Sequence, residues 1–222
     1  MKKIRMVQRV DLIREKAASK SVLHLGCTNY PYTQDSIEKN MLLHLDLQKT
    51  ASELYGFDFD QEGIDTLAAA GVPNLYRADL EHLDQVELDR KFDVIIAGEM
   101  IEHLLNPGLF LNGIKRFMHP GTELVITTVN AYAAVRMFPY ALRGKGGVNE
   151  PVHPDHVAYY SYKTLSKLVQ NAGFDVADFM FYDVGHEHRP TLAWYYRLMN
   201  DLSVAIFPQL SDGVIAVCKL KS

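Results

Sequence analysis

Residues 92–104, which read FDVIIAGEMIEHL, decide the fold of this chain and locate its chemistry. The apolar run from Phe92 to Ala97 is typical of a strand that is buried on both faces of a parallel sheet. Two carboxylates and an imidazole follow it, at Glu99, Glu102 and His103. Ligands of open α/β sheets bind beyond the carboxyl ends of the strands, so we expect a site here. The spacing of these side chains predicts that one helical turn carries all three on one face.

Strand-like and helix-like segments alternate on both sides of this stretch. The alternation predicts an α/β fold with a doubly wound, mostly parallel sheet of seven strands, the last pair antiparallel, and with helices on both faces. The expected strands are residues 22–25, 53–57, 75–78, 92–97, 123–129, 174–184 and 213–218. The expected helices are residues 4–19, 41–50, 61–70, 109–118, 162–172 and 191–207.

Length and composition fit one globular domain over residues 1–222, with an N-terminal helix in residues 1–20. Lys and Arg number 23 against 27 Asp and Glu, a formal net charge of −4, which disfavours nucleic acid as a partner. Two cysteines, Cys27 and Cys218, are too few for a disulfide framework, so we expect buried free thiols and a cytoplasmic protein. No apolar stretch reaches the roughly 20 residues of a membrane span.

The other strand ends carry a glycine and acids. Gly26, after the first strand, lets the backbone approach a ligand closely. Asp58, after the second strand, can accept hydrogen bonds from two ribose hydroxyls, while we expect Asp60 to cap the next helix. Asp79, after the third strand, can accept the exocyclic amine of an adenine, with Leu80 against the ring. In the alternative, these acids are caps or solvated turn residues.

Taken together, these turns resemble the class I S-adenosylmethionine-dependent methyltransferases over roughly residues 20–180. Residues 99–104 (EMIEHL), the following Asn106-Pro107 and residues 156–161 (HVAYYS) are similar to the branch that contains many small-molecule O-methyltransferases. The resemblance implies a Rossmann-like fold, S-adenosylmethionine as cofactor, and a hydroxyl of a sugar or secondary metabolite as acceptor. It also places lid segments on the acceptor side, at residues 131–160 and 185–207.

By the same resemblance, the first turn holds the methionine part of the cofactor, and the next two strand ends hold its ribose and adenine. The cofactor-binding residues that it implies are His24, Gly26, Cys27, Asp58, Phe59, Asp79, Leu80 and Glu99. The first turn departs from the family pattern, because His24 replaces an acid and Gly26 is its one remaining glycine.

The acceptor chemistry leaves three alternatives. Glu99, Glu102 and His103 match part of a pattern in the small-RNA 3′-terminal 2′-O-methyltransferases, where two glutamates and two histidines bind a divalent ion. By that resemblance His156 is the fourth ligand. Two carboxylates and two imidazoles suit Mg²⁺, Mn²⁺ or Zn²⁺. In the metal-free alternative, His103 or His156 is the catalytic base for the acceptor hydroxyl. In the third, Glu102 and His103 only stabilise the loop.

Four histidines lie in two predicted loops. His153 and His156 flank a Pro-Asp pair, and His186 and His188 follow the sixth predicted strand. Loop histidines are often merely solvated, and we expect only His156 to take part in the chemistry, with His186 and His188 at the rim or surface.

The sequence therefore supports three functions. The first is methyl transfer to a hydroxyl of a small molecule, by a monomer or homodimer. The second is metal-dependent 2′-O-methylation of RNA, which the acidic composition disfavours. The third is a non-catalytic partner protein with a methyltransferase fold, suggested by the altered first turn.

Overall fold

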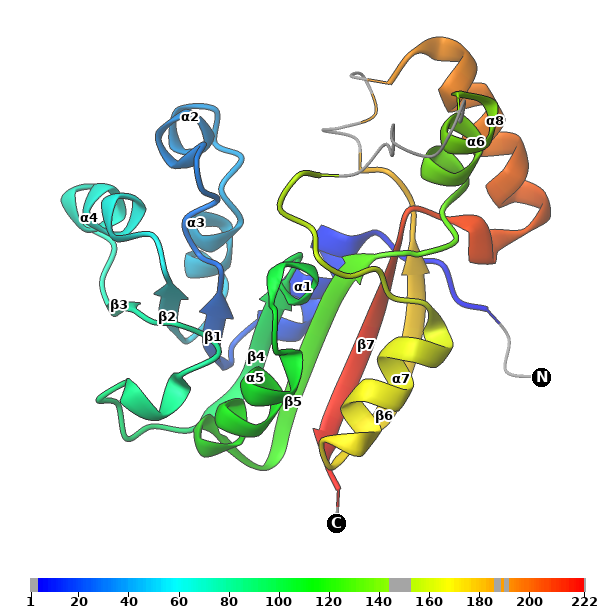
Figure 1. Cartoon of the computed structure of the whole chain (residues 1–222). Coiled ribbons are helices and arrows are strands. Elements are labelled where there is room, and N and C mark those ends of the chain that lie inside the picture. The colour runs from blue at the N-terminus through cyan, green and yellow to red at the C-terminus, as the bar shows by residue number, and fades with distance from the viewer. Residues whose placement is uncertain (1–3, 144–152, 186–188, 190–191, 222) are drawn as a thin grey trace.

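A seven-stranded sheet organises the computed structural model, which describes residues 4–143, 153–185, 189 and 192–221. The strands are β1 (Ser21–Leu25), β2 (Glu53–Asp58), β3 (Leu75–Arg77), β4 (Phe92–Gly98), β5 (Met118–Val129), β6 (Phe174–Tyr182) and β7 (Gly213–Leu220). Their order is β3-β2-β1-β4-β5-β7-β6 (Figure 1). Pairing is parallel from β3 to β5, and β7 runs antiparallel to both β5 and β6. The predicted sheet is confirmed.

Strand β4 lies in the middle of the sheet because both of its faces are apolar. Ile95 and Ala97 face one hydrophobic cluster, and Val94 and Ile96 face the other. The sequence of a strand that is buried on both sides is apolar throughout, and residues 92–97 predicted β4 for this reason.

Helices cover both faces of the sheet (Figure 1). The helices are α1 (Arg9–Ala17), α2 (Thr33–Glu38), α3 (Leu43–Gln48), α4 (Gln61–Ala69), α5 (Pro107–Gly113), α6 (Ala134–Arg143), α7 (Tyr162–Asn171) and α8 (Trp194–Ile206). Helices α5 and α7 pack against one core cluster, and α1 and α3 against the other. Helices α6 and α8 contact each other beyond the carboxyl ends of the parallel strands, at the top of Figure 1.

Helix ends follow the predicted signals. The Asp60 side chain accepts the N–H of Gly63 (3.0 Å) and caps α4, as expected. Ser161 and Thr164 form a reciprocal capping box at the start of α7. Gly173 follows α7 with φ of +85°, a left-handed conformation that suits glycine.

Three elements differ from the sequence prediction. The helix expected over residues 4–19 covers only Arg9–Ala17, because the residues before it pair with the edge of β6 through a parallel bridge between Met6 and Phe181. Helix α2 was not predicted. Strand β5 begins at Met118 rather than at residue 123, so it includes residues 119–122, which we expected to connect a helix to the strand.

Within the described ranges, no helix combines the length and the apolar character needed to cross a bilayer.

Candidate cofactor and acceptor site

The turn after β1 folds with a single glycine because an asparagine takes a second left-handed position. Gly26 has φ of +73° and Asn29 has φ of +64°. Asparagine tolerates this region better than other side chains. The Asn29 amide also donates to Ser36 Oγ (2.7 Å), which ties the turn to α2. The turn therefore keeps its shape without the usual series of glycines.

Asp58 joins the carboxyl ends of β1 and β2. Its Oδ2 accepts the N–H of Thr28 (2.9 Å), and its Oδ1 accepts the N–H of Asp60 (3.0 Å). Each carboxylate oxygen has more than one lone pair, so both can accept a further hydrogen bond. This arrangement is compatible with the predicted contact to ribose hydroxyls, which stays a prediction.

The end of β3 carries the side chains expected near an adenine. Asp79 is exposed and accepts the N–H of Glu81 (2.9 Å), and its other oxygen lies 2.9 Å from His82 Nδ1. Leu80 packs partly against the core. The Phe59 ring is 64% exposed, with the Arg77 guanidinium 5.1 Å from its centre. These hydrogen bonds are those of a solvated turn residue, which was the alternative to an adenine contact for Asp79. Phe59 presents a ring on which a base can stack.

His24 and Cys27, two expected cofactor residues, have side chains inside the protein. His24 lies on the same face of β1 as Val22, with Nδ1 3.2 Å from Nδ1 of His44 in α3. Burial lowers the pKa of His24 well below its ordinary value and that of His44 to about 4. The imidazoles are therefore a neutral, stacked pair in the core. The side chain of His24 does not reach the strand ends, which corrects the sequence prediction.

The Cys27 thiol is also buried, as is that of Cys218, so the expected buried free thiols are confirmed. A Cβ atom at Gly56 would lie 2.8 Å from Cys27 Sγ and from His44 Cε1. Gly56 thus makes room for the side chains beneath the first turn. Cys27 is fully buried, and its N–H donates to the carbonyl of Phe57 (3.4 Å), which corrects its predicted contact with the cofactor.

Glu99, after β4, adopts φ of +52°, which is unusual for a residue with a side chain. Its Oε1 accepts hydrogen bonds from Thr127 Oγ1 (2.8 Å) and from the Tyr182 hydroxyl (2.6 Å). Backbone outliers of this kind cluster at functional sites. Glu99 is thereby held across the ends of β5 and β6.

Glu102 is buried, and its Oε2 accepts the Thr128 hydroxyl (2.8 Å). Burial, and then the charge of Glu99, raise the pKa of the Glu102 carboxyl to about 8. Its backbone carbonyl accepts the N–H groups of Val157 (2.9 Å) and Ala158 (3.2 Å). Glu102 therefore anchors the segment before α7 to the turn after β4.

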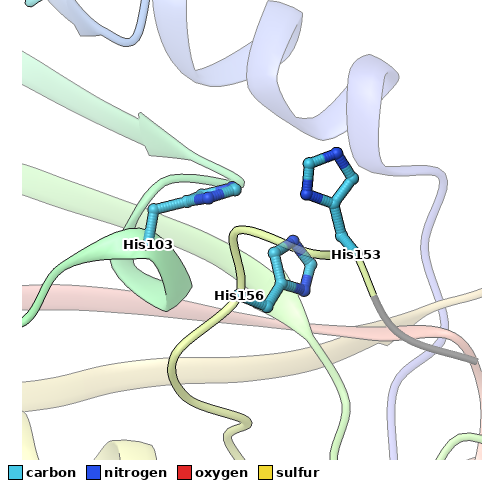
Figure 2. A group of neighbouring side chains, drawn as sticks. All are labelled: His103, His153 and His156. Carbon is cyan, nitrogen blue, oxygen red and sulfur yellow. The ribbon is translucent and has the colours of Figure 1, made fainter. Parts of the chain in front are cut away.

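His103 lies beside His153 and His156, with its ligand atom close to theirs (Figure 2). The rings of His103 and His156 have centres 4.7 Å apart, and those of His153 and His156 5.1 Å apart. Desolvation, and then neighbouring imidazoles, lower the pKa of His156 to about 4, and desolvation also lowers the pKa of His103. Both imidazoles are neutral at pH 7 and can accept a proton or ligate a metal.

The structure therefore separates the residues expected on one helical face. A 3₁₀ turn over Ile101–His103 replaces the α-helical turn, and the left-handed Glu99 turns its side chain back toward β5. Among the described residues, the ligand atoms that converge belong to His103, His153 and His156, without a glutamate. This corrects the predicted metal set of Glu99, Glu102, His103 and His156.

Three residues of this region were not predicted. His153 joins the histidine group, Tyr182 holds Glu99, and His44 pairs with His24. Only His153 had a signal in the sequence, since it lies three residues before His156. His186 and His188 lie outside the described residues, as do residues 144–152 of the first expected lid segment.

Comparisons with known proteins agree with this architecture. A family model described as a methyltransferase domain matches residues 5–178. A probable S-adenosylmethionine-dependent methyltransferase from Mycolicibacterium smegmatis is 25% identical over 169 residues, which are 75% of this chain and 56% of that protein. A ubiquinone biosynthesis O-methyltransferase from Pseudomonas paraeruginosa is 26% identical over 211 residues. The match covers 88% of this chain and 81% of that protein. This chain thus spans little more than half of the first relative.

The crystal structure of an S-adenosylmethionine-dependent methyltransferase from Archaeoglobus fulgidus has the same fold. It superposes with a TM-score of 0.57 at 16% identity, over 95% of this chain and 94% of that one.

Proposed function

This chain belongs to the methyltransferase domain family, and we propose that it transfers the methyl group of S-adenosylmethionine to a hydroxyl of a small molecule. The names of two relatives support the cofactor and the hydroxyl acceptor, since one is a probable S-adenosylmethionine-dependent methyltransferase and the other a ubiquinone biosynthesis O-methyltransferase. The acidic composition favours a small molecule over RNA.

The observation that carries the proposal is the position of Asp58. Its carboxylate lies between the turn after β1 and the start of α4 and retains lone pairs for two ribose hydroxyls. Beside it, Gly26 leaves the backbone open, because a Cβ atom there would meet, in the part of the chain that the structure describes and apart from its chain neighbours, only Met100 at 3.9 Å. These residues fit a nucleoside cofactor at the carboxyl ends of β1 and β2.

S-adenosylmethionine would supply an electrophilic methyl group at this edge of the sheet. The protein's own residues would bind and orient the two reactants. Gly26 and Asp58 would hold the cofactor, and the histidine group would hold the acceptor. His103 or His156, neutral at pH 7, would take the proton that the acceptor hydroxyl loses. Correct alignment of the two reactants supplies much of the rate in such a transfer.

Calorimetric titration with S-adenosylhomocysteine tests this proposal. We expect binding by the unaltered protein and a roughly 10- to 100-fold weaker affinity for Asp58→Asn, since hydrogen bonds to a charged acceptor contribute about 1.5–3 kcal/mol. Asp60→Asn is the matched control, because asparagine caps a helix as well as aspartate does. It should leave the affinity unchanged.

Two results would count against it. Equal affinities of Asp58→Asn and the unaltered protein would contradict the ribose contact. Absence of binding by the unaltered protein at millimolar S-adenosylhomocysteine would instead favour a non-catalytic partner protein.

A further inference from the structure

We propose that His103, His153 and His156 form a binding site for one divalent transition-metal ion, with Zn²⁺ as the reference ion. Each imidazole offers one ligand nitrogen, and these three atoms all lie within 4.8 Å of one another. The residues come from the turn after β4 and from the segment that leads to α7, and their rings surround a common space (Figure 2).

The ring arrangement favours convergence on one ion. His103 is nearly perpendicular to both partners, with interplanar angles of 78° to His153 and 84° to His156. Three nitrogens around a tetrahedral zinc ion, each about 2.0–2.1 Å from it, are about 3.3 Å apart. Small rotations of the exposed rings of His103 and His153 therefore suffice to close the site.

Hydrogen bonds to the backbone of Asp155 already orient two of these rings, and the one to His153 runs from the Asp155 N–H to Nδ1 (3.3 Å). His103 Nδ1 donates to the carbonyl of Asp155 (3.2 Å), which leaves Nε2 as its ligand atom. Metal-binding histidines commonly use their second nitrogen in this way. His156 Nδ1 is buried without a hydrogen-bond partner among the described residues.

The backbone holds the two segments together independently of any ion. The N–H of His156 donates to the carbonyl of His153 (3.1 Å), and the Glu102 carbonyl accepts from Val157 (2.9 Å) and Ala158 (3.2 Å). Because these bonds fix the backbone on both sides, the three imidazoles need little reorganisation to bind.

The donor set selects the kind of ion. Imidazole nitrogen suits zinc, copper, nickel and iron, whereas Mg²⁺ and Mn²⁺ favour oxygen ligands. Glu99 and Glu102 are instead hydrogen-bonded to hydroxyl groups of β5. An ion that prefers nitrogen ligands, such as the Zn²⁺ that the sequence also allowed, therefore fits these residues better than Mg²⁺ or Mn²⁺.

Three protein ligands leave at least one position of the ion open to water or to an acceptor. This role, unlike metal binding itself, rests on the proposed function. A bound acceptor hydroxyl would have a lowered pKa and a fixed orientation, so the ion would assume the part of a histidine base.

Titration of chelator-treated protein with Co²⁺ and Zn²⁺ tests the site, followed by visible absorption and calorimetry. We expect one equivalent of metal and a Co²⁺ spectrum of low coordination number. His153→Ala should weaken binding by more than about 100-fold, which exceeds the roughly 10- to 100-fold cost of losing a group that supports a ligand. His119→Ala, at the opposite end of β5, should bind as the unaltered protein does.

A His186→Ala/His188→Ala double variant covers the histidines outside the described residues and should also retain the metal. Unchanged affinity in His153→Ala, or loss of metal in the double variant, would overturn the proposal. S-adenosylhomocysteine affinity is measured on the same samples. Metal binding without binding of S-adenosylhomocysteine would contradict the proposed function but support the metal site. Binding of S-adenosylhomocysteine without metal binding would contradict the metal site alone.

Discussion

The buried pair of His24 and His44 shows how surroundings alone fix the charge of a side chain. The two Nδ1 atoms lie 3.2 Å apart, so one ring donates to the other and the two neutral tautomers differ. His44 Nε2 has no hydrogen-bond partner among the described residues. A proton added to either ring would place a charge in the core, close to its neighbour.

We expect this pair to make the protein sensitive to acid. An unfolded histidine has a pKa near 6.5, whereas the folded His44 has a pKa of about 4. The unfolded chain therefore binds more protons, and stability falls as pH decreases from about 6.5 to 4. The loss attributable to His44 approaches about 3 kcal/mol.

Urea denaturation at pH 7 and pH 4.5 measures this loss. His44→Leu should be less sensitive to acid than the unaltered protein, with a residual slope from His24. His119→Ala, a histidine on the outside of the sheet, serves as the control. Equal acid sensitivity of His44→Leu and the unaltered protein would refute the explanation.

At this scale the sequence predicts where polar residues lie better than where they point. The position of Glu99, Glu102 and His103 after a buried strand followed from the apolar run before them. Their directions depend on the backbone, since Glu99 is left-handed and the following turn is 3₁₀. Neither feature has a reliable sequence signal, because both are imposed by contacts with β5.

At the scale of the elements, strand β7 supports the site through Gly213, whose lack of a side chain makes room for the ring of Tyr182. A Cβ atom at Gly213 would lie 1.9 Å from Cζ of Tyr182. The ring of Tyr182 therefore lies over this glycine, and its hydroxyl reaches Glu99 from there.

Gly213→Ala should displace the Tyr182 ring and release Glu99. Overpacking of this kind usually costs about 1–3 kcal/mol, so we expect a lower melting temperature and weaker binding of S-adenosylhomocysteine. Gly108→Ala in α5 is the control, because among the described residues the added Cβ meets no atom within 4 Å apart from its chain neighbours and the backbone of its own helix. Thermal unfolding and calorimetry of the two variants make the comparison. A normal melting temperature for Gly213→Ala would show that the ring moves without cost.

The strands were more predictable than some of the helices. Buried parallel strands are apolar throughout, so β1, β2 and β4 stand out from the loops around them. Helix α2 has no hydrophobic stripe, and only Thr33 and Ser36 are buried in it. The N-terminal helix was overestimated because residues 4–8 have helical spacing. The backbone of residues 5–7 instead pairs with the distant strand β6, through hydrogen bonds with Phe181.

In the whole molecule, the N-terminal segment covers part of an exposed sheet edge. Val7 donates its N–H to the carbonyl of Phe181 (2.9 Å), and Phe181 donates to the carbonyl of Arg5 (2.9 Å). Unpaired edge strands invite association with other chains. We infer that this segment protects β6.

Val7→Pro should remove the first of these hydrogen bonds, leave the Phe181 carbonyl unpaired and lower stability by roughly 1–3 kcal/mol. Met6→Pro is the matched control, because Met6 lies between the two bonded positions and proline is tolerated at an edge where its nitrogen faces solvent. Denaturation and light scattering should show that Val7→Pro is less stable and more prone to aggregate. Equal behaviour of the two proline variants would contradict the protective role.

The strand order also governs how this protein acquires its structure. Strand β7 lies between β5 and β6, although it follows both in the chain. Until β7 arrives, the inner edges of β5 and β6 have no partner, and the residues that meet there are far apart in sequence. Such long-range pairing slows folding and lengthens the time for which hydrophobic strands stay exposed. The facing edges of β5 and β6 are therefore completed only when the last strand of the chain is inserted between them.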